Sequence, residues 1–204
     1  MNELTQTIAT YEQIAGTYAR ARQDRALLRP HFARFAALLG PGGRVLDAGS
    51  GPGFDTAVLQ SAGFRAVGLD LAWGMLRAGR DELGLRVPLV QGDLRALPFG
   101  AGCFEGAWAC AALLHLPRTA VSAALGELRR VLTGGGVLYL SVQQGEGEGW
   151  QPRAYGQARP RFFTYWQPEM LDAALAAADL RPIYASAEAA GATVWLNRLA
   201  RAGD

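Results

Sequence analysis

Three glycines at alternate positions follow a short apolar segment, and their spacing suggests a main chain shaped to hold a nucleotide-type ligand. The segment Val45-Leu46-Asp47-Ala48-Gly49-Ser50-Gly51-Pro52-Gly53 reads as a strand that ends in an acid and continues into a tight loop, after which a helical pattern begins. Glycine permits backbone conformations closed to other residues and lets a ligand approach the main chain, beside the positive end of the following helix. The loop therefore predicts a nucleotide-type site and leaves open which nucleotide it holds.

The glycine spacing argues against a bound pyrophosphate. A dinucleotide fingerprint reads G-x-G-x-x-G, whereas Gly49, Gly51 and Gly53 give G-x-G-x-G, and Phe54 stands where the third dinucleotide glycine is required. A phosphate-binding G-x-x-x-x-G-K-S/T loop is excluded because the chain contains no lysine. We therefore expect that this loop does not hold phosphates.

Two later acids provide for a nucleoside instead. Asp70 ends the second expected strand, where a carboxylate can accept hydrogen bonds from the 2′- and 3′-hydroxyls of a ribose. Asp93 ends the third expected strand, in Gln91-Gly92-Asp93-Leu94, where it can accept a hydrogen bond from the exocyclic amine of adenine. Ribose and adenine are thus provided for, and pyrophosphate is not.

The elements that must position these residues alternate along the chain. Apolar spacing predicts helices at 7–21, 31–39, 55–62, 73–82 and 168–178, and one more with Val121, Leu125, Leu128 and Leu132 on one face. It predicts strands ending at residue 48 and at 64–69, 87–91, 104–110, 137–143 (after a turn at 134–136), 181–186 and 192–198. Such alternation is typical of a parallel sheet covered on both faces, whose ligands bind at the carboxyl ends of the strands.

The composition excludes several classes of protein. Half of the 204 residues are hydrophobic and 19% are charged, so disorder is not expected. The formal net charge is +2 and the arginines are scattered, so we expect neither a nucleic-acid nor a membrane partner. No apolar run approaches the roughly 20 residues that span a bilayer, and residues 1–13 show no leader, so we expect a cytoplasmic protein. Cys103 and Cys110 lack partners at ligand spacing, so we expect no metal site.

Residues 144–167 break the alternation and gather aromatic side chains and arginines. These are Trp150, Arg153, Tyr155, Arg159, Arg161, Phe162, Phe163, Tyr165 and Trp166. Because the segment follows a strand end, we expect it to overhang the ligand site as a lid or substrate wall, suited to a planar or acidic small molecule. The alternative is a surface loop whose aromatic side chains fill the core.

Five short motifs in order resemble those of the Rossmann-like (class I) S-adenosylmethionine-dependent methyltransferases, and within them the small-molecule group related to the ubiquinone and menaquinone biosynthesis enzymes. The resemblance covers residues 11–180. Its motifs are residues 45–53, Val67-Gly68-Leu69-Asp70, Gly92-Asp93-Leu94 with Leu97-Pro98-Phe99, Phe104-Glu105 through Leu113-Leu114-His115-Leu116-Pro117, and Glu127-Leu128-Arg129-Arg130-Val131-Leu132 with Gly135-Gly136. Each motif alone is weak, but five in order at the family's intervals form a strong signal.

The alternation and the resemblance together predict one methyltransferase domain over residues 1–204, as a monomer or homodimer. We expect an α/β three-layer sandwich with a mostly parallel, seven-stranded doubly wound sheet and an antiparallel last strand. Its expected parts are an N-terminal helical cap at 1–40, a cofactor-binding half at 41–143, the aromatic insertion or lid at 144–167, and a C-terminal helix and strands at 168–204.

The resemblance implies that S-adenosylmethionine is the cofactor, that S-adenosylhomocysteine is the product, and that each matched residue has a role. Gly49, Ser50 and Gly51 would line the methionine portion of the cofactor, Asp47 would hold the loop, and Asp70 would bind the ribose. The other implied contacts lie around the adenine (Leu71, Met75, Asp93 and Leu94), near the sulfonium (Ala109 and Cys110) and, from the N-terminal helix, near the carboxylate (Tyr11, Tyr18 and Arg20).

Two departures from the family pattern concern the pocket walls. Glu105 stands where aspartate is commoner, and Trp73-Gly74 opens the helix after Asp70 where small polar residues are usual. We expect neither to abolish cofactor binding, although Trp73 would narrow the adenine pocket.

His115 is the expected general base if the methyl acceptor must lose a proton. It lies just past the strand at 104–110, where the crevice should open, and histidine has an unperturbed pKa near 6.5. The alternative is that His115 only ties the loop by a hydrogen bond. His31 is expected at the surface or at a helix end.

The expected activity is methyl transfer from S-adenosylmethionine to a small-molecule acceptor. Since the methyl group arrives activated, the protein must chiefly align the reacting atoms. The N-P-P-Y type signature that resembles amino-methylating DNA enzymes is absent, which argues against a nucleic-acid acceptor. Two alternatives remain: a non-catalytic protein that binds the adenosyl cofactor, and a nicotinamide oxidoreductase, against which Phe54 argues.

Overall fold

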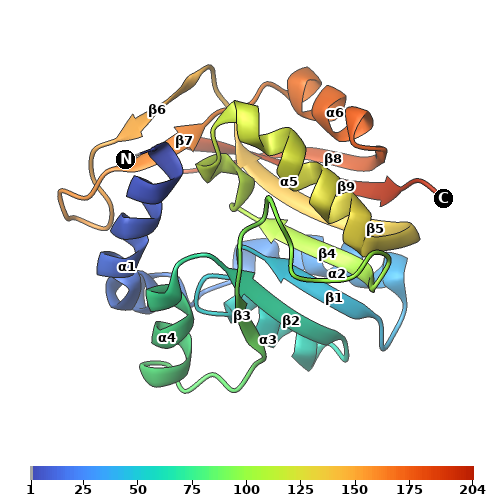
Figure 1. Ribbon diagram of the computed structural model, residues 1–204, viewed down its shortest axis with the longest axis horizontal. Coiled ribbons are helices and arrows are strands. Elements are labelled where there is room, and N and C mark those ends of the chain that lie inside the picture. The colour runs from blue at the N-terminus through green and yellow to red at the C-terminus, as the bar shows by residue number, and fades with distance from the viewer. Residues whose placement is uncertain (1) are drawn as a thin grey trace.

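A seven-stranded sheet forms the centre of the computed structural model, which describes residues 2–204 (Figure 1). The strand order is β3-β2-β1-β4-β5-β9-β8, and only β9 runs antiparallel to its neighbours. The strands are β1 (Arg44–Ala48), β2 (Arg65–Asp70), β3 (Leu89–Gln91), β4 (Phe104–Cys110), β5 (Leu132–Gln143), β8 (Leu180–Ala190) and β9 (Thr193–Ala202). The predicted fold class, including the antiparallel last strand, is confirmed.

Helices cover both faces of this sheet (Figure 1). They are α1 (Glu3–Ala21), α2 (Arg29–Leu39), α3 (Phe54–Ser61), α4 (Trp73–Asp81), α5 (Arg118–Val131) and α6 (Pro168–Ala177), with short 3-10 turns η1 (Ala26–Leu28) and η2 (Leu113–His115). The apolar faces of α5 and α6 share one core cluster, and those of α2 and α3 share another. Each helix buries the stripe that its apolar spacing predicts.

Helix α1 forms the cap over the carboxyl ends of the strands. Its first turn begins at Asn2, whose side chain accepts a hydrogen bond from the backbone N–H of Thr5 at 2.9 Å, so an orphan donor of the helix is satisfied. Ala15 and Ala19 of α1 pack against Met75 and Ala78 of α4. The small alanines let the two helices approach closely, and the cap is thereby fixed beside the strand ends.

The aromatic segment contains a hairpin that the sequence did not predict. Strands β6 (Glu148–Gln151) and β7 (Arg161–Thr164) pair antiparallel as a separate two-stranded sheet. The backbone N–H of Phe162 donates to Thr7 Oγ1 at 2.9 Å, and Thr10 Oγ1 donates to the carbonyl of Pro160 at 2.7 Å. The hairpin is therefore attached to the cap helix α1, from which it is separated by about 150 residues of chain.

One local prediction was wrong and another was right only in part. Residues 134–136, expected as a turn before β5, form a bulge inside it: Phe104 pairs with Leu132 and Gly106 already pairs with Val137, and Gly135 has a φ of 69° that glycine permits at little cost. His31, expected at the surface or at a helix end, lies in the first turn of α2, but it is 1% exposed and so not at the surface. It lies on the inner face of α2, with its ring 5.4 Å from that of Tyr139.

No helix among residues 2–204 has the length and apolar character needed to cross a bilayer.

Candidate functional site

A cavity of about 100 Å³ opens at the carboxyl ends of β1, β2 and β4, beneath helix α1. Strand order reverses between β1 and β4, and ligands of doubly wound sheets bind at such a reversal. The predicted site residues that line the cavity are Tyr11, Tyr18, Gly49, Gly51, Asp70, Leu71, Met75, Asp93, Leu94, Cys110 and His115. Elements far apart in the sequence thus bring most of the predicted set together.

Four predicted residues lie outside the cavity lining. Arg20 is exposed and pairs with Glu82 at 2.7 Å. Asp47 is buried below the glycine loop, where its Oδ2 accepts a 2.6 Å hydrogen bond from Thr56 Oγ1. Ser50 is also buried, and its hydroxyl points under the loop: a Cβ on Gly68 would lie 2.8 Å from Ser50 Oγ. Ala109 is fully buried in the sheet.

Seven lining residues were not among the predicted site residues. They are Leu4, Thr7 and Ile8 of α1, Gly92 after β3, Ala111 and Ala112 after β4, and Leu116. The amphipathic pattern of α1 could have predicted Leu4, Thr7 and Ile8, because a helix that covers the sheet turns its apolar face toward it. Ala111 has a φ of 53°, and a positive φ cannot be predicted from the sequence at an alanine, because this conformation is rare for residues other than glycine.

The glycine loop is held so that its main chain faces the cavity. The N–H groups of Gly49 and Ser50 both donate to the carbonyl of Leu69, at 2.8 and 2.9 Å. Gly49 has a φ of 78°, and a Cβ added there would lie 2.3 Å from Cβ of Ala112. A side chain at position 49 would therefore collide with the residue after β4, so glycine is required.

Asp70 joins the loop to the second strand. Its Oδ2 accepts from the N–H of Gly51 and its Oδ1 from the N–H of Ala72, each at 2.8 Å. Burial raises the pKa of this carboxyl to about 6, against the effect of these hydrogen bonds. Each carboxylate oxygen has a second acceptor site, so the group can still bind two hydroxyls of a ligand.

Asp93 is engaged within its own loop. Its Oδ2 accepts a 2.6 Å hydrogen bond from Nη2 of Arg95, and its Oδ1 accepts from the backbone N–H of Arg95 at 2.9 Å. The hydrogen bond from the Arg95 side chain lowers the pKa of Asp93. Asp93 therefore lines the cavity as an ionised carboxylate that already has a partner.

His115 forms the centre of a hydrogen-bonded chain at the other end of the cavity. Its Nδ1–H donates to the carbonyl of Phe162 at 2.8 Å, so Nε2 is the unprotonated nitrogen and accepts from the Tyr11 hydroxyl at 2.7 Å. Burial lowers the pKa of His115 to about 3 and raises that of Tyr11 to about 12. The imidazole is thus neutral and its free lone pair is directed at Tyr11.

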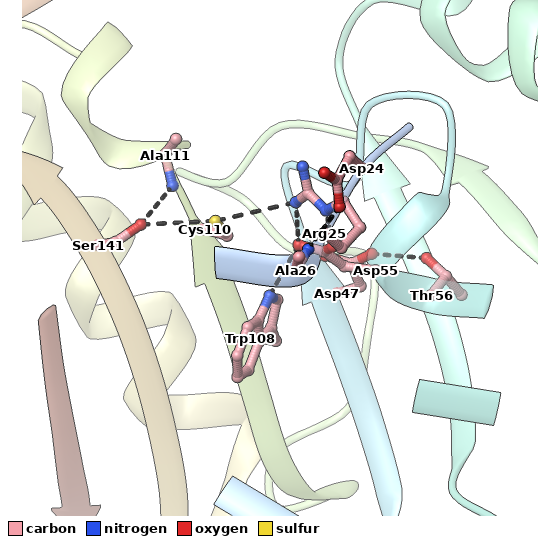
Figure 2. Close-up of polar contacts among 10 residues, drawn as sticks. All are labelled: Asp24, Arg25, Ala26, Asp47, Asp55, Thr56, Trp108, Cys110, Ala111 and Ser141. Carbon is pink, nitrogen blue, oxygen red and sulfur yellow. Dashed lines mark hydrogen bonds and ion pairs between the residues drawn. The ribbon is translucent and has the colours of Figure 1, made fainter. Parts of the chain in front are cut away.

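A buried charged cluster supports the glycine loop from below (Figure 2). Arg25, between α1 and η1, forms a two-pronged ion pair with Asp55, with Nε to Oδ1 and Nη2 to Oδ2 both 2.5 Å. The indole N–H of Trp108 also donates to Asp55, at 2.9 Å. Arg25 Nη2 lies 4.0 Å from Sγ of Cys110, which lines the cavity. The cluster therefore connects the end of the cap to the residues under the loop.

Replacing Asp47 by asparagine is expected to reduce the pH dependence of stability. Burial and the neighbouring charge of Asp55 raise the pKa of Asp47 in the folded protein above the value of about 4 that is usual in unfolded chains. The folded state keeps a proton that the unfolded state releases, so this contribution to the free energy of unfolding is fully present below about pH 4 and falls as the pH rises through the folded pKa.

Urea unfolding at about pH 5 and about pH 8 measures this effect. The free energy of unfolding should fall less between the two pH values in Asp47→Asn than in the unsubstituted protein. Asp81→Asn, at an exposed site on α4, is the matched control. Equal pH dependence in the protein and in Asp47→Asn would contradict the protonated state of Asp47.

Within residues 2–204, no group of three or more His, Cys, Asp or Glu side chains is placed to hold a metal ion. Cys103 and Cys110 are free thiols, and burial raises the pKa of Cys110 to about 12. Cys110 therefore lines the cavity as a neutral thiol.

Comparisons with known proteins identify a methyltransferase domain in this chain. Residues 45–136 match the family model described as a methyltransferase domain. The crystal structure of 1,6-didemethyltoxoflavin-N1-methyltransferase from Burkholderia thailandensis, with bound 1,6-didemethyltoxoflavin and S-adenosylhomocysteine, is similar with a TM-score of 0.74 and 26% identity, over 100% of this chain and 92% of that chain. Residues 45–136 are thus a methyltransferase domain, and the chain resembles the class I S-adenosylmethionine-dependent methyltransferases. The resemblance predicted from the five motifs is confirmed, and S-adenosylmethionine is the cofactor of this family.

Curated relatives of this chain include methyltransferases with different acceptors in their names. The demethylmenaquinone methyltransferase of Corynebacterium kroppenstedtii is 42% identical over 98 residues, which are 48% of this chain and 41% of the relative. The malonyl-(acyl-carrier protein) O-methyltransferase of Laribacter hongkongensis is 36% identical over 152 residues, covering 66% of this chain and 49% of the relative. The methyltransferase chain spans about half the length of these curated relatives.

Proposed function

We propose that this methyltransferase transfers the methyl group of S-adenosylmethionine to a small-molecule acceptor in the cytoplasm. The observation that carries the proposal is the meeting of the glycine loop, Asp70 and His115 around one cavity. The similar methyltransferase of Burkholderia thailandensis was solved with a small heteroaromatic molecule, 1,6-didemethyltoxoflavin, beside S-adenosylhomocysteine. An acceptor of comparable size fits the proposal, and a nucleic-acid or membrane partner does not form part of it.

The walls of the cavity fit the chemistry of this cofactor. Ala112 lies close to Gly49 and Met75 lies close to Gly51, where an added Cβ would be 3.2 Å from Met75 Cε. Because glycine has no side chain at these positions, the main chain of the loop is accessible to a ligand. We assign the methionine portion to this loop and the ribose hydroxyls to Asp70. The proposed adenine contacts are the apolar side chains of Leu71, Met75 and Leu94, with Asp93 at the edge. Asp47, Ser50 and Ala109 would then act from behind the loop and strand.

The acceptor would lie between this loop and the cap helix. When bound, S-adenosylmethionine supplies a methyl group on a positively charged sulfur that leaves as a neutral thioether. The chain's own part is to align the acceptor and to take its proton where it has one. Tyr11 and His115 form the route: the Tyr11 oxygen can take the acceptor's proton while its own proton moves to His115 Nε2.

The domain division is part of the same proposal. Residues 1–40 would act as the cap, 41–143 as the cofactor-binding half, 144–167 as the wall of the acceptor site and 168–204 as the closing helix and strands. The assembly would be a monomer or a homodimer. Tyr18 would help to close the cavity over the loop, since a Cβ on Gly51 would lie 3.9 Å from Tyr18 Cε1.

Calorimetric titration with S-adenosylhomocysteine tests the cofactor assignment. The unsubstituted protein is expected to bind it, and Asp70→Asn is expected to lose about 1 to 3 kcal/mol of binding free energy, because a buried partner of the ribose hydroxyls is removed. Asp81→Asn, exposed on the neighbouring helix α4, is the control that should bind as the unsubstituted protein does.

Other outcomes would redirect the proposal. Unchanged affinity in Asp70→Asn would refute the ribose assignment. Binding of NAD(H) without binding of S-adenosylhomocysteine would favour an oxidoreductase. Cofactor binding without methyl transfer to phenols, carboxylates or amines would favour a non-catalytic binding protein.

A further inference from the structure

Arg161 places a positive charge in the aromatic segment without an acidic partner. Its guanidinium carbon lies 5.1 Å from the ring centre of Phe163, 5.5 Å from that of Tyr155 and 5.8 Å from that of Tyr11. In the part of the chain from residue 2 to 204, no carboxylate oxygen lies within 4.0 Å of its nitrogens. Its Nε is buried and has no hydrogen-bond partner.

The backbone on both sides of Arg161 is fixed. The carbonyl of Pro160 accepts from Thr10 of α1 at 2.7 Å, and the N–H of Phe162 donates to Thr7 of the same helix at 2.9 Å. The carbonyl of Phe162 also accepts from His115 Nδ1. The position of the guanidinium is therefore set by the contact of the hairpin with α1 and η2.

This charge reaches the cavity through Tyr11. Arg161 Nη1 donates to the Tyr11 hydroxyl at 3.2 Å, and that hydroxyl donates to His115 Nε2. Tyr11 and His115 line the cavity, as does Asp70, whose charge adds to the effect of burial in raising the pKa of Tyr11. The side chains around Arg161 are the rings of Tyr11 from α1, Tyr155 from the loop after β6 and Phe163 from β7, and His115 of η2 is joined to it through Tyr11.

A half-buried cation that lacks an anion is costly unless a ligand supplies one. Aromatic faces attract a cation but do not neutralise it. We propose that Arg161, which acts on the cavity through the Tyr11 hydroxyl and does not itself line it, is the positioning residue for anion recognition in the acceptor site, and that it favours an aromatic acceptor bound as the conjugate base of an acidic O–H or N–H group. This inference rests on the proposed function for the nature of the cavity, but its test needs no methyl transfer.

Binding of 4-nitrophenol to the full chain saturated with S-adenosylhomocysteine tests the inference, because the ionisation of this probe is read from its visible absorbance. The unsubstituted protein is expected to bind the phenolate more tightly than the phenol, so the pKa of the bound probe falls below that of the free probe. Arg161→Gln is expected to weaken phenolate binding by about ten- to a hundredfold. Arg161→Lys, which keeps the charge, should retain part of the preference.

Two controls make the result specific. Arg159→Gln removes an exposed arginine from the same segment and should leave the pKa of the bound probe unchanged. 4-Nitroanisole, which has no acidic hydroxyl, should bind equally to the unsubstituted protein and to Arg161→Gln.

Several results would overturn the inference: a bound probe whose pKa is not lowered, absence of probe binding, or the same lowering in Arg161→Gln. If Arg161→Gln does not fold, the pKa of 4-nitrophenol bound to the unsubstituted protein still tests the inference, because a pKa that is not lowered contradicts it. Failure of S-adenosylhomocysteine itself to bind, measured separately by calorimetry, would count against the proposed function, whereas cofactor binding with no preference for the phenolate would count against Arg161 alone.

Discussion

His115→Gln is expected to lower kcat for methyl transfer by about 10²- to 10⁴-fold while S-adenosylhomocysteine still binds. The neutral imidazole accepts a hydrogen bond from Tyr11 and donates one to the carbonyl of Phe162. Glutamine can form hydrogen bonds of this kind. The acceptor's O–H or N–H becomes strongly acidic as it is methylated, so even an imidazole with a pKa of about 3 can take its proton as the new bond forms, which a glutamine amide cannot do. The variant therefore lacks the group that accepts the acceptor's proton. The residues under the glycine loop are unchanged, so cofactor binding is kept.

The pH profile tests whether His115 is neutral before the proton is transferred. Because burial lowers the pKa of His115 to about 3, the imidazole stays neutral above that pH, and kcat should not fall through a titration near 6.5 as the pH decreases. Tyr11→Phe interrupts the chain at its first oxygen and should lower kcat with little change in cofactor affinity.

The dependence on the acceptor gives a further check. The loss in His115→Gln should shrink as the acceptor becomes more acidic, because an acceptor that is already ionised has no proton to give up. Exposed Arg153→Gln in the aromatic segment serves as the control and should leave kcat unchanged. Equal activity of His115→Gln and the unsubstituted protein with a weakly acidic phenol would contradict the proton route.

The loop end of the sheet was predictable because a few local rules act there together. Glycines at positions 49, 51 and 53 each have a positive φ. Their spacing after an apolar strand predicted a tight loop of this kind. Asp70 ends β2 beside β1, and parallel strands bring their carboxyl ends to one edge. Position in the strand and residue type were enough to place these residues at the cavity.

The acceptor side was only partly predictable, because contacts between distant segments define it. Tyr11 and His115 are 104 residues apart, and Arg161 lies 150 residues from Tyr11. The aromatic composition of residues 144–167 indicated a wall, but no periodicity in the sequence predicted the hairpin that places Arg161 over Tyr11. The sequence pattern also could not predict which single residue at the end of β4 reaches the cavity. Ala109 lies in the core, whereas Ala111 and Ala112 line the cavity.

The burial of polar side chains was the other feature that the sequence pattern could not show. His31 was expected at the surface or at a helix end; it lies in the first turn of α2, yet its ring is buried against Tyr139. Arg25 was not singled out at all, since an arginine in a polar connection normally points to solvent. Its burial follows from Asp55, a carboxylate in the first turn of α3 that the core encloses on its other sides.

Arg25→Met is accordingly expected to lower the free energy of unfolding by about 3 to 5 kcal/mol, the typical cost of leaving one member of a buried ion pair without its partner. Asp55 is 5% exposed at its side chain and would keep only the Trp108 N–H as a hydrogen-bond donor, with the carboxyl of Asp47 nearby. Urea unfolding followed by circular dichroism measures the difference.

Arg20→Met is the matched control, because Arg20 pairs with Glu82 at the exposed surface, where ion pairs contribute about 0 to 1 kcal/mol. Replacing both members of the buried pair, as Arg25→Met with Asp55→Leu, should restore part of the loss, since an apolar pair leaves no charge unpaired. If Arg25→Met unfolds at the same urea concentration as Arg20→Met, the ion pair does not hold the end of the cap to the glycine loop. The expected order is therefore Arg20→Met most stable, then the double variant, then Arg25→Met, and this order follows from burial alone.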